Sequence, residues 1–485
     1  MQEDRYRKRY EKLKKTIIFL VYLLIILILA FIVYIYWDAF KARIGDAVQK
    51  SIEDTAIVTA SDIIYTPIAQ TEEITLSPTP TLSATPFIIP SLPYGQPEEY
   101  GFDPVKIAEM DNYIQKQINN GFPGAVILIA KDGHIIFHKA YGYSKKYEGK
   151  TLMDEFENMD KDTLFDLASL SKIYATTFSI MKLVDDGAIS LDGKIKDYLS
   201  NYGGGEKDNI TVRMLLSHNA GYIEDYYFYE DGEYSTRNRE EVYNYIKQIP
   251  LDDSPGETFD YNNIDYMILG MIVEEVSGMR IDEYARENIY EPLGLEEQIT
   301  YRPLDMGIER KNIAATERLG NTRDGSVYFE GIRQYTIQGE VHDENAYYSM
   351  DQVSGHAGLF ANAYALTVLN QVLLNKGEYG GVRIYNEETI DKWLTTYQTE
   401  SRYQIGFWNA KKANLVLKQY VSDETYYHNG WTGTATIVDV ENNLSIIILT
   451  NKRHSPCPNG KFEALNYDLA GYVPVIQEIY KCLVD

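Results

Sequence analysis

The sequence predicts an α+β protein in which an antiparallel β-sheet, flanked by helices and carrying a helical insertion, follows one transmembrane helix. Three observations support this prediction. A run of 22 residues without charge lies near the N-terminus, β-type runs lie at both ends of the segment 99–485, and helical patterns and loops fill the part between about 190 and 345. Strands at both ends with helices between them are typical of one sheet built from the two chain ends.

The N-terminal 37 residues have the pattern of a membrane anchor. Residues 16–37, TIIFLVYLLIILILAFIVYIYW, are long enough to cross a bilayer as a helix. Residues 1–15 hold seven basic and three acidic side chains, so the positive-inside rule predicts a cytoplasmic tail and an extracytoplasmic remainder. A cleaved signal peptide is the alternative, but the apolar core is too long and bulky residues follow it. No other apolar stretch is comparable, which predicts a single-pass protein of the cell membrane.

Residues 38–98 are expected to form a stalk. Seven of the 16 prolines lie between Pro67 and Pro97, in a segment that is also rich in Thr and Ser. This composition favours an extended, semi-rigid tether over a packed core. For the part next to Tyr100, an ordered arm on the surface of the following domain is the alternative.

Residues 99–485 are expected to form the catalytic domain, with the helical insertion at about 190–345. The first two strands are joined by the hairpin signal Lys131-Asp132-Gly133-His134, and the clearest helix of the insertion stops at Ser277-Gly278. The predicted elements are a helix over 103–119, strands over 125–130 and 135–141, a helix from Ser169, a helix over 264–276, strands over 404–409, 435–440 and 444–450, and a helix over about 462–482.

Composition limits the partners and the chemistry. The formal net charge is −25, and −29 without residues 1–15, which argues against nucleic acid as a ligand. With only Cys457 and Cys482, the fold cannot depend on a disulfide framework, although the two could pair. The seven histidines form no pattern of metal ligands, so we expect neither a metal nor another cofactor.

Ser169 and Lys172 are the first candidate catalytic residues. They form the motif Ser169-Leu170-Ser171-Lys172 at the start of an apolar-periodic run. A serine needs a group that takes its proton before it becomes a good nucleophile. A lysine three residues further along a helix lies on the same face and, in a dry pocket, can act as that base.

Two later stretches add polar groups that such a site needs. Tyr261 and Asn263, in PGETFDYNN, lie where a loop enters the predicted helix at 264. A tyrosine held near a lysine can serve as a general base, and an asparagine amide can bind a substrate amide. The alternatives are an N-cap asparagine and a packed aromatic side chain.

The stretch His428-Asn429-Gly430-Trp431-Thr432-Gly433-Thr434 precedes a predicted strand. Glycines at a strand edge allow a ligand to approach closely. A free N–H on this edge, together with that of Ser169, would make an oxyanion hole. The alternative is a glycine-rich turn with one exposed histidine. The stretches LLSHNAG at 215–221, VHDENA at 341–346 and GHAGLF at 355–360 are expected mainly to shape the pocket.

The order of these motifs from about residue 100 to 485 resembles the serine β-lactamase-related family, which includes class C β-lactamases, low-molecular-weight penicillin-binding proteins and related esterases. The resemblance implies the β-lactamase/transpeptidase-like fold, Ser169 as the acylating nucleophile, and Lys172 and Tyr261 as the pair that moves protons. It places Asn263 on the substrate amide and His428 where many members have the lysine of K-T-G. The Trp431 N–H would complete the oxyanion hole.

Two positions depart from the family pattern. Asn262 replaces the serine of Y-S-N, and Asn429 replaces the threonine of K-T-G, whose hydroxyl helps to hold a substrate carboxylate. Together with His428, Asn429 disfavours efficient turnover of β-lactams. Substrate contacts are therefore expected from Asn263, His428, Asn429, Gly430 and Trp431.

The expected function is that of a membrane-anchored extracytoplasmic serine hydrolase that forms an acyl-enzyme. Its substrate would be a small peptide, an ester or a β-lactam, and peptidoglycan is a possible partner. A D-alanyl peptidase or carboxypeptidase and an esterase are favoured equally, ahead of a β-lactamase. The alternative is a non-hydrolytic penicillin sensor that stays acylated. The aromatic and acidic segment from Tyr222 to Tyr245 could grip a substrate but is more typical of a solvated surface.

Overall fold

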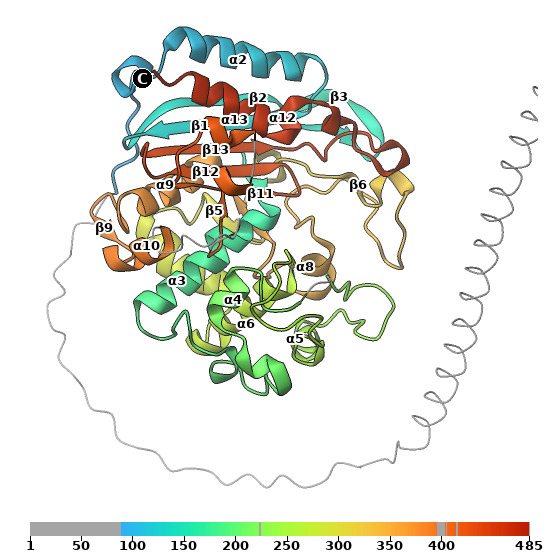
Figure 1. Cartoon of the computed structure of the whole chain (residues 1–485). Coiled ribbons are helices and arrows are strands. Elements are labelled where there is room, and N and C mark those ends of the chain that lie inside the picture. Colours follow the sequence, from blue (N-terminus) through green and yellow to red (C-terminus); the bar gives the residue numbers. More distant parts are fainter. Residues whose placement is uncertain (1–88, 223–224, 395–402, 404, 414–415, 485) are drawn as a thin grey trace, which may run out of the picture. The chain divides into compact units, whose positions relative to one another are not determined.

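A seven-stranded antiparallel sheet is the centre of the structure. The computed structural model describes residues 89–222, 225–394, 403, 405–413 and 416–484. The sheet has the strand order β10-β11-β12-β13-β1-β2-β3 (Figure 1). Its strands are β1 (Gly124–Lys131), β2 (His134–Glu148), β3 (Thr151–Asn158), β10 (Trp408–Asn409), β11 (Thr425–Gly430), β12 (Thr434–Asp439) and β13 (Leu444–Thr450).

The two chain ends meet at the pairing of β1 with β13, which confirms the prediction of one sheet built from both ends. The register runs from Ala125 opposite Thr450 to Lys131 opposite Leu444. Both strands are almost wholly apolar because both of their faces are covered. Val126 and Leu128 enter the core on one face, and Ile127 and Ile129 enter the core on the other.

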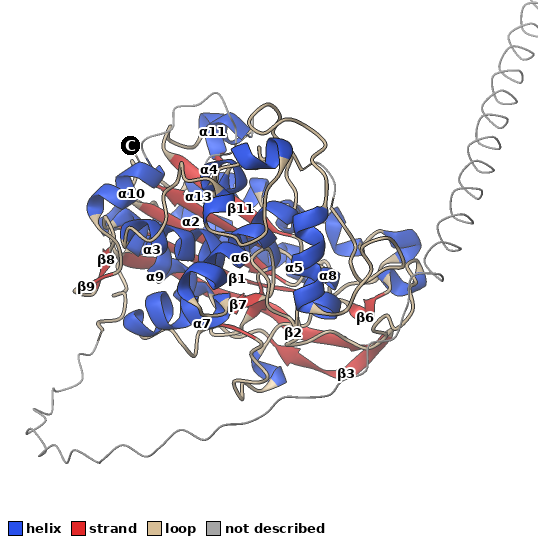
Figure 2. Cartoon of the chain, turned by 90° about the horizontal axis from the view of Figure 1, so that it is seen from below, coloured by secondary structure: helices blue, strands red, loops and turns tan. Residues whose placement is uncertain are grey.

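Helices cover each face of this sheet. On one face lie α2 (Pro104–Asn119) and α13 (Val473–Lys481), which pack with Ile127 and Ile448. On the other face lie α3 (Phe178–Asp185), α6 (Ile264–Ser277) and α9 (Ala363–Leu374), as Figures 1 and 2 show. The predicted fold class, an antiparallel sheet flanked by helices with a helical insertion, is confirmed for the described residues.

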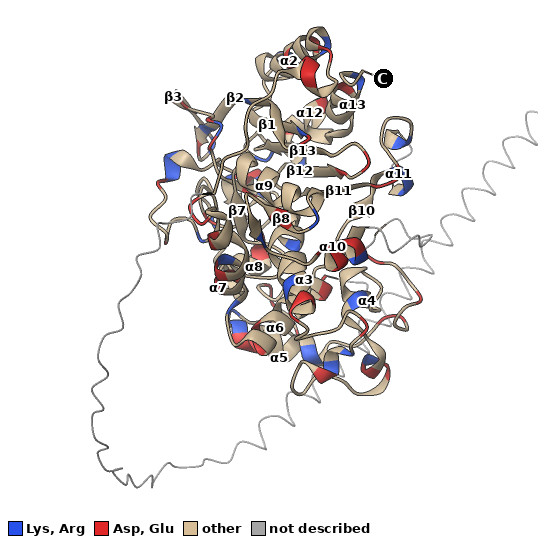
Figure 3. Cartoon of the chain, turned by 90° about the vertical axis from the view of Figure 1, so that its left-hand side faces the viewer, with Lys and Arg blue, Asp and Glu red and all other residues tan. Residues whose placement is uncertain are grey.

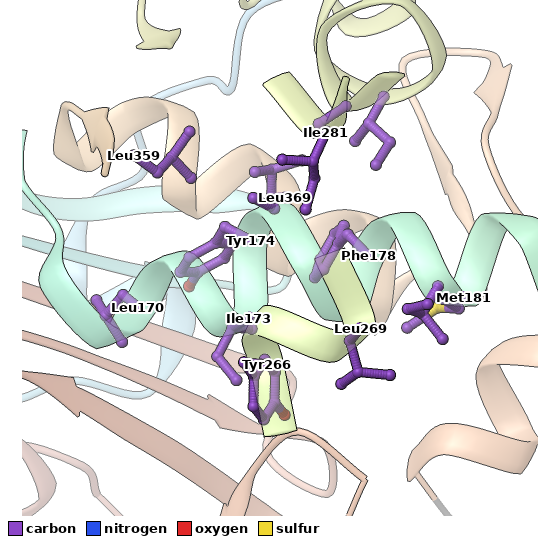
Figure 4. Packing of buried hydrophobic residues seen from close by; sticks show 14 of the residues in the cluster. Leu170, Ile173, Tyr174, Phe178, Met181, Tyr266, Leu269, Ile281, Leu359 and Leu369 are labelled. Carbon is purple, nitrogen blue, oxygen red and sulfur yellow. The ribbon is translucent and has the colours of Figure 1, made fainter. Parts of the chain in front are cut away.

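The segment after Ser169 runs through the larger core. It begins with a 3-10 turn (Ala168–Leu170), continues as a π-helix (Lys172–Thr177) and becomes α3 at Phe178. Figure 4 shows its apolar side chains packed against Tyr266 and Leu269 of α6 and against Leu369 of α9. A π-helical turn is uncommon and occurs mostly at functional sites.

The remaining elements surround this core and complete the helical insertion. A small sheet with the order β4-β7-β5 lies beside the Ser169 turn. The elements are β4 (Phe165–Asp166), α4 (Val212–Leu216), α5 (Arg239–Gln248), α7 (Ile281–Ala285), β5 (Ile299–Tyr301), β6 (Arg318–Asn321), α8 (Glu344–Ser349), β7 (Leu359–Ala361), β8 (Glu378–Tyr379), β9 (Val382–Arg383), α10 (Glu387–Leu394), α11 (Ala410–Ala413) and α12 (Asp468–Gly471).

Two predicted elements are wrong in extent. The strand expected over 404–409 is reduced to β10, because Gly406 adopts φ +87° and lies directly against Thr177, so the chain bends there. The helix expected over about 462–482 is split into a 3-10 turn, α12 and α13. Tyr472 has φ +59° between the two α-helices, and Pro474 in the first turn of α13 cannot donate the hydrogen bond that would continue the preceding helix.

The described end of the predicted stalk packs on the domain. Leu92 is buried, the N–H of Gly95 donates to the carbonyl of Ile135 at 3.0 Å, and the N–H of Ile135 donates to Pro93 at 2.8 Å. The rest of the stalk and the predicted anchor at 16–37 lie outside the described residues. Within the part of the chain that is described, no helix is both long and apolar enough to cross a membrane.

Charged side chains lie mainly on the helices and loops. Figure 3 shows both acidic and basic residues on α5 and α10, whereas β13 carries none. Cys457 and Cys482 are both buried as free thiols, so the disulfide that the sequence left open is absent from the structure.

Candidate active site

Ser169 lies in a tight turn directly after β4. The buried carboxylate of Asp166 accepts a hydrogen bond from the N–H of Ala168 at 2.8 Å, and the N–H of Leu167 donates to Leu359 at 2.9 Å. Ala168 has φ +47°, a left-handed conformation that is uncommon for a residue with a Cβ. Such strain persists where the surroundings enforce it, often at functional sites. The turn leaves Ser169 partly exposed while Ala168 and Leu170 on either side are buried.

The amine of Lys172 lies against Ser169. Its Nζ is 3.3 Å from Ser169 Oγ, 2.7 Å from Asn263 Oδ1 and 3.5 Å from the carbonyl oxygen of His356. The side chain is fully buried. Two of its three neighbours are carbonyl oxygens, which only accept hydrogen bonds, whereas the serine hydroxyl can donate or accept. A neutral amine in this position would therefore direct its lone pair at Ser169.

Tyr261 lies beside the same amine, with Lys172 Nζ 5.0 Å from the centre of its ring. Tyr261 is partly exposed, and its hydroxyl makes no hydrogen bond with any residue that the structure describes. It is thus available to a bound substrate. The structure thus places the Ser169 hydroxyl and the Tyr261 ring around the amine of Lys172.

Asn263 is held from two sides. Its Oδ1 accepts from Lys172, its Nδ2 donates to Asp225 at 3.1 Å, and its backbone N–H donates to the same carboxylate at 2.7 Å. Asn263 precedes α6, but its side chain makes no capping hydrogen bond, which removes the N-cap alternative. Asn262 is buried and bonds Asp265 and two backbone carbonyls, so the residue in the place of the family serine is a structural one.

The strand β11, second from the edge of the main sheet, lies against the Ser169 turn. A Cβ on Gly430 would lie 2.3 Å from the carbonyl oxygen of Leu167 and 3.3 Å from Ala168 Cβ, so only glycine allows this approach. Asn429 is exposed and Trp431 is 52% exposed. The third motif therefore lies next to Ser169, with Trp431 at the surface beside it.

Hydrogen bonds fix the turn after Gly430 at every residue. Tyr472 donates to the Gly430 carbonyl at 3.3 Å and Arg453 Nε donates to the Trp431 carbonyl at 2.8 Å. The Gly433 carbonyl accepts from Thr450 Oγ1 at 2.8 Å, and the hydroxyls of Thr432 and Thr434 donate to the carbonyls of Asp166 and Leu167 at 2.6 and 3.0 Å. Because two of these bonds end on the residues just before Ala168, the two backbone segments expected to form the oxyanion hole are tied to each other.

His428 is buried close to the candidate catalytic residue Tyr261. Its ring is 5.9 Å from that of Tyr261, and Nδ1 lies 3.0 Å from the Asn429 carbonyl. Burial, and then the nearby charge of Lys172, lower the pKa of His428 to about 3. The imidazole is therefore neutral at physiological pH, with Nδ1–H donated to the backbone and Nε2 as an acceptor.

Several residues of the site were not predicted as such. His218, assigned only to pocket shape, is buried 4.5 Å from the Tyr261 ring and lies 3.1 Å from Asp265. Burial drives the pKa of His218 well below its ordinary value. Asp225 and His356 lie in stretches that the sequence singled out, the aromatic segment and GHAGLF, but nothing in those stretches predicted their contacts with Asn263 and Lys172. They contact the site only through the tertiary fold.

The stretches at 341–346 and 355–360 hydrogen-bond the buried residues that position Ser169 and Lys172. The N–H of His342 donates to Asp166 at 2.6 Å, and His356 Nε2 lies 2.9 Å from Asp343. Position 355 has no space for a side chain, because a Cβ there would lie 2.1 Å from the Tyr266 carbonyl oxygen. This close contact with α6 brings the His356 carbonyl to Lys172.

Some aromatic residues of the segment from Tyr222 to Tyr245 pack against the rest of the domain. Tyr222 is buried and shares a 2.7 Å hydrogen bond with Tyr202. Tyr229 packs against Phe329 and Tyr348, with ring centres 4.7 and 5.8 Å away. These contacts anchor parts of the segment in the domain, but more than half of its described residues are exposed, as the prediction of a solvated surface expects. In the described part of the chain, no group of three or more acidic, cysteine or histidine side chains could hold a metal ion.

The chain belongs to the Beta-lactamase family, whose pattern matches residues 110–467, and it is a serine hydrolase of that family. It is 41% identical to an N-acetylmuramyl-L-alanine amidase of Bacillus subtilis, over 79% of this chain and 90% of the relative. It is 38% identical to a putative D-alanyl-D-alanine carboxypeptidase of Escherichia coli K12, over 81% of this chain and 94% of the relative.

Solved structures agree on the fold. A penicillin-binding protein homologue from Caulobacter crescentus aligns with a TM-score of 0.59 at 20% identity, over 79% of this chain and 99% of the other. A class C β-lactamase aligns with a TM-score of 0.58 at 16% identity, over 79% and 97%. The β-lactamase/transpeptidase-like fold is therefore confirmed.

Replacing Lys172 should abolish the activation of Ser169. Lys172→Ala removes the amine that lies next to the hydroxyl, and we expect the rate of Ser169 labelling by a fluorophosphonate to fall by about 10²–10⁴-fold. The matched control is Lys207→Ala, because Lys207 is also a buried lysine whose Nζ donates to a backbone carbonyl, that of Lys247. Equal labelling rates in the Lys172→Ala variant and the unmodified protein would exclude Lys172 as the base.

The buried neutral His428 should make stability depend on pH. Between pH 3 and 6.5 the unfolded imidazole binds a proton that the folded one does not, so the free energy of unfolding falls as pH falls through this window. His428→Gln removes this contribution. The slope should decrease by up to about 1.4 kcal/mol per pH unit, measured by urea unfolding between about pH 4.5 and 6. Parallel curves for the two proteins would contradict the buried neutral state.

Proposed function

We propose that this protein is a membrane-anchored, extracytoplasmic serine amidohydrolase that cleaves amide bonds in peptidoglycan fragments through an acyl-enzyme. The observation that carries the proposal is the position of Lys172. Its buried amine touches Ser169 Oγ at 3.3 Å and is otherwise surrounded by oxygen atoms that only accept hydrogen bonds. This is the arrangement of an activated nucleophile and its base.

Acylation follows from this geometry. The Ser169 oxygen bonds to the substrate carbonyl carbon as its proton moves to Lys172 Nζ, and the N–H groups of Ser169 and Trp431 bind the resulting oxyanion. The proton then passes to the leaving amine, for which the unoccupied Tyr261 hydroxyl is the conduit, and the C–N bond breaks. Water releases the acyl group by the same steps in reverse order.

The substrate class rests on the relatives and on β11. The two relatives above are named for the amide between N-acetylmuramic acid and L-alanine and for the D-alanyl-D-alanine peptide, both bonds of peptidoglycan. The exposed Asn429 and the neutral His428 offer neither the hydroxyl nor the cation of K-T-G. We therefore place peptidoglycan amides ahead of β-lactams and simple esters.

The location rests on the sequence. The uncharged run at 16–37 and the basic residues before it support an anchor with the catalytic domain outside the membrane. Peptidoglycan peptides are found on that side.

The catalytic proposal is tested by product analysis with the purified full chain. N-acetylmuramyl-L-alanine and diacetyl-L-lysyl-D-alanyl-D-alanine are incubated with the protein, and released amino acids are identified by mass spectrometry. We expect sustained release from at least one substrate and a loss of at least about 10³-fold in Ser169→Ala. Ser190→Ala is the control, because Ser190 is an exposed serine. A single burst without further product would instead favour a sensor that stays acylated.

The anchor is tested by topology in intact cells. Cysteine labelling with a membrane-impermeant maleimide, on a variant with a cysteine introduced at Ser77 in the stalk, should modify the protein without lysis. A cysteine introduced at Gln2 should react only after lysis. Release of the chain into the soluble fraction by carbonate washing would contradict the anchor.

A further inference from the structure

An exposed aromatic ring lies beside the candidate active site, on the segment that holds Asn263. Asp225 accepts two hydrogen bonds from Asn263, from its backbone N–H at 2.7 Å and from Nδ2 at 3.1 Å. Oδ1 of the same asparagine accepts from Lys172. Tyr227 follows Asp225 by two residues, so their Cα atoms are at most about 7 Å apart. Its side chain is 59% exposed and is therefore available to a ligand that reaches this site.

The backbone on both sides of Tyr227 is fixed by tertiary contacts. Phe228 is fully buried, and its N–H donates to Asn345 Oδ1 at 2.9 Å. Nδ2 of the same asparagine donates to the carbonyl of Tyr226 at 2.6 Å. The Phe228 carbonyl accepts from the N–H of Thr236 at 2.7 Å. Tyr227 is thus an exposed ring on a rigid backbone, and a tyrosine so held offers a large contact area with little loss of conformational entropy.

Three further aromatic rings continue from Tyr227. Its ring packs edge-on against that of Tyr229, with the ring centres 6.0 Å apart. Tyr229 packs in turn against Phe329 and Tyr348, at 4.7 and 5.8 Å. All three of these rings are partly exposed. We call Tyr227, Tyr229, Phe329 and Tyr348 the aromatic surface.

The charges beside the aromatic surface favour an uncharged ligand. Between residues 225 and 233 every exposed charged side chain is acidic, namely Asp225, Glu230, Asp231 and Glu233. These carboxylates repel nucleotides and other anions. Cations are already supplied by the chain itself, because the guanidinium groups of Arg237 and Arg333 lie 5.0 and 5.6 Å from the centre of the Tyr348 ring.

A sugar ring has the chemistry that this surface requires. The C–H groups on one face of a hexose pack against the electron-rich face of an aromatic ring. Its hydroxyl groups donate hydrogen bonds, for which the exposed carboxylates are acceptors. In the amide of N-acetylmuramyl-L-alanine the sugar belongs to the acyl group, and only an ether oxygen and one carbon separate its ring from the carbonyl. A carbonyl placed at Ser169 would therefore bring the sugar close to the residues around Asn263.

We propose that the aromatic surface binds the N-acetylhexosamine of a peptidoglycan fragment, with the sugar ring stacked on Tyr227, and so selects substrates whose acyl group carries this sugar. The inference rests on the proposed function and names the part of the fragment that the same site recognises. It also gives the segment from Tyr222 to Tyr245 two roles. Its buried residues fix the backbone, and its exposed ring and carboxylates contact the ligand.

The kinetic test compares two amides that differ only in the sugar. N-acetylmuramyl-L-alanine is compared with (R)-2-methoxypropanoyl-L-alanine, in which a methyl group replaces the sugar on the ether oxygen. With the full chain, we expect kcat/KM for the muramyl compound to be higher by about 10-fold or more. Tyr227→Ala should reduce this ratio by about 5-fold, mainly by raising KM for the muramyl compound. Tyr227→Phe, which keeps the ring, should preserve most of the ratio.

The matched control is Tyr94→Ala. Tyr94 is 64% exposed and lies beside Ile135 at the start of β2, and its replacement should not change the ratio. Equal kcat/KM values for the two compounds in the unmodified protein would overturn the sugar site while the amidohydrolase function stands. An equal loss for both compounds in Tyr227→Ala would also overturn it and leave Tyr227 as a packing residue.

A binding measurement keeps the inference independent of turnover. Saturation-transfer difference NMR of methyl N-acetyl-β-D-glucosaminide, an uncharged sugar, is recorded with the full chain carrying Ser169→Ala. Transfer to the C–H protons of the sugar ring, lost when Tyr227→Ala is added, would support the sugar site even if no amide were hydrolysed, in which case the proposed function alone would fail. Absent transfer, or equal transfer in the double variant, would overturn the sugar site.

The same variants distinguish a sugar from a peptide on this surface. The peptide probe is diacetyl-L-lysyl-D-alanyl-D-alanine, which carries no sugar. If Tyr227→Ala lowered kcat/KM for this peptide as much as for the muramyl compound, the aromatic surface would be a peptide site and the proposal would be overturned. A loss confined to the muramyl compound supports it.

Discussion

The buried amine of Lys172 is the constraint on which the site depends. A buried amine needs hydrogen-bond partners in place of water, and Lys172 finds them in the Ser169 turn, in the loop before α6 and in the loop before β7. These three segments must therefore dock together. Gly355 makes this possible, because its lack of a side chain lets the last loop lie directly on α6. Asp225 holds Asn263 in place from the solvent side.

The second half of the site is a rigid turn between β11 and β12. Its carbonyl and hydroxyl groups bond Tyr472, Arg453, Asp166, Thr450 and Leu167. Oxyanion stabilisation is effective when donors need no reorganisation during the reaction. The bonds to Asp166 and Leu167 matter most here, since they couple this turn to the one that carries Ser169. The strained Ala168 is held between them.

The histidines and carboxylates around the nucleophile are kept neutral or are already bound. His428 and His218 are kept neutral by burial, and the carboxylates nearest the site are bound by backbone N–H groups or by histidine. Arg453, which holds the Trp431 carbonyl, has no carboxylate oxygen within 4.0 Å among the described residues.

The sequence by itself determined the two-ended sheet, the helix after residue 264, and the motif residues Ser169, Lys172, Tyr261, Asn263 and His428. The sheet and the helix follow from periodicity, which is a local property of the chain, and the candidate roles of the motif residues follow from the resemblance of their order to the family pattern. Only the tertiary structure decided the break at Tyr472, the loss of the strand before Trp408, and the partners Asp225, His356 and Arg453. Each of these depends on contacts between segments that are distant in sequence, such as Gly406 against Thr177, and no local pattern encodes which distant group will arrive.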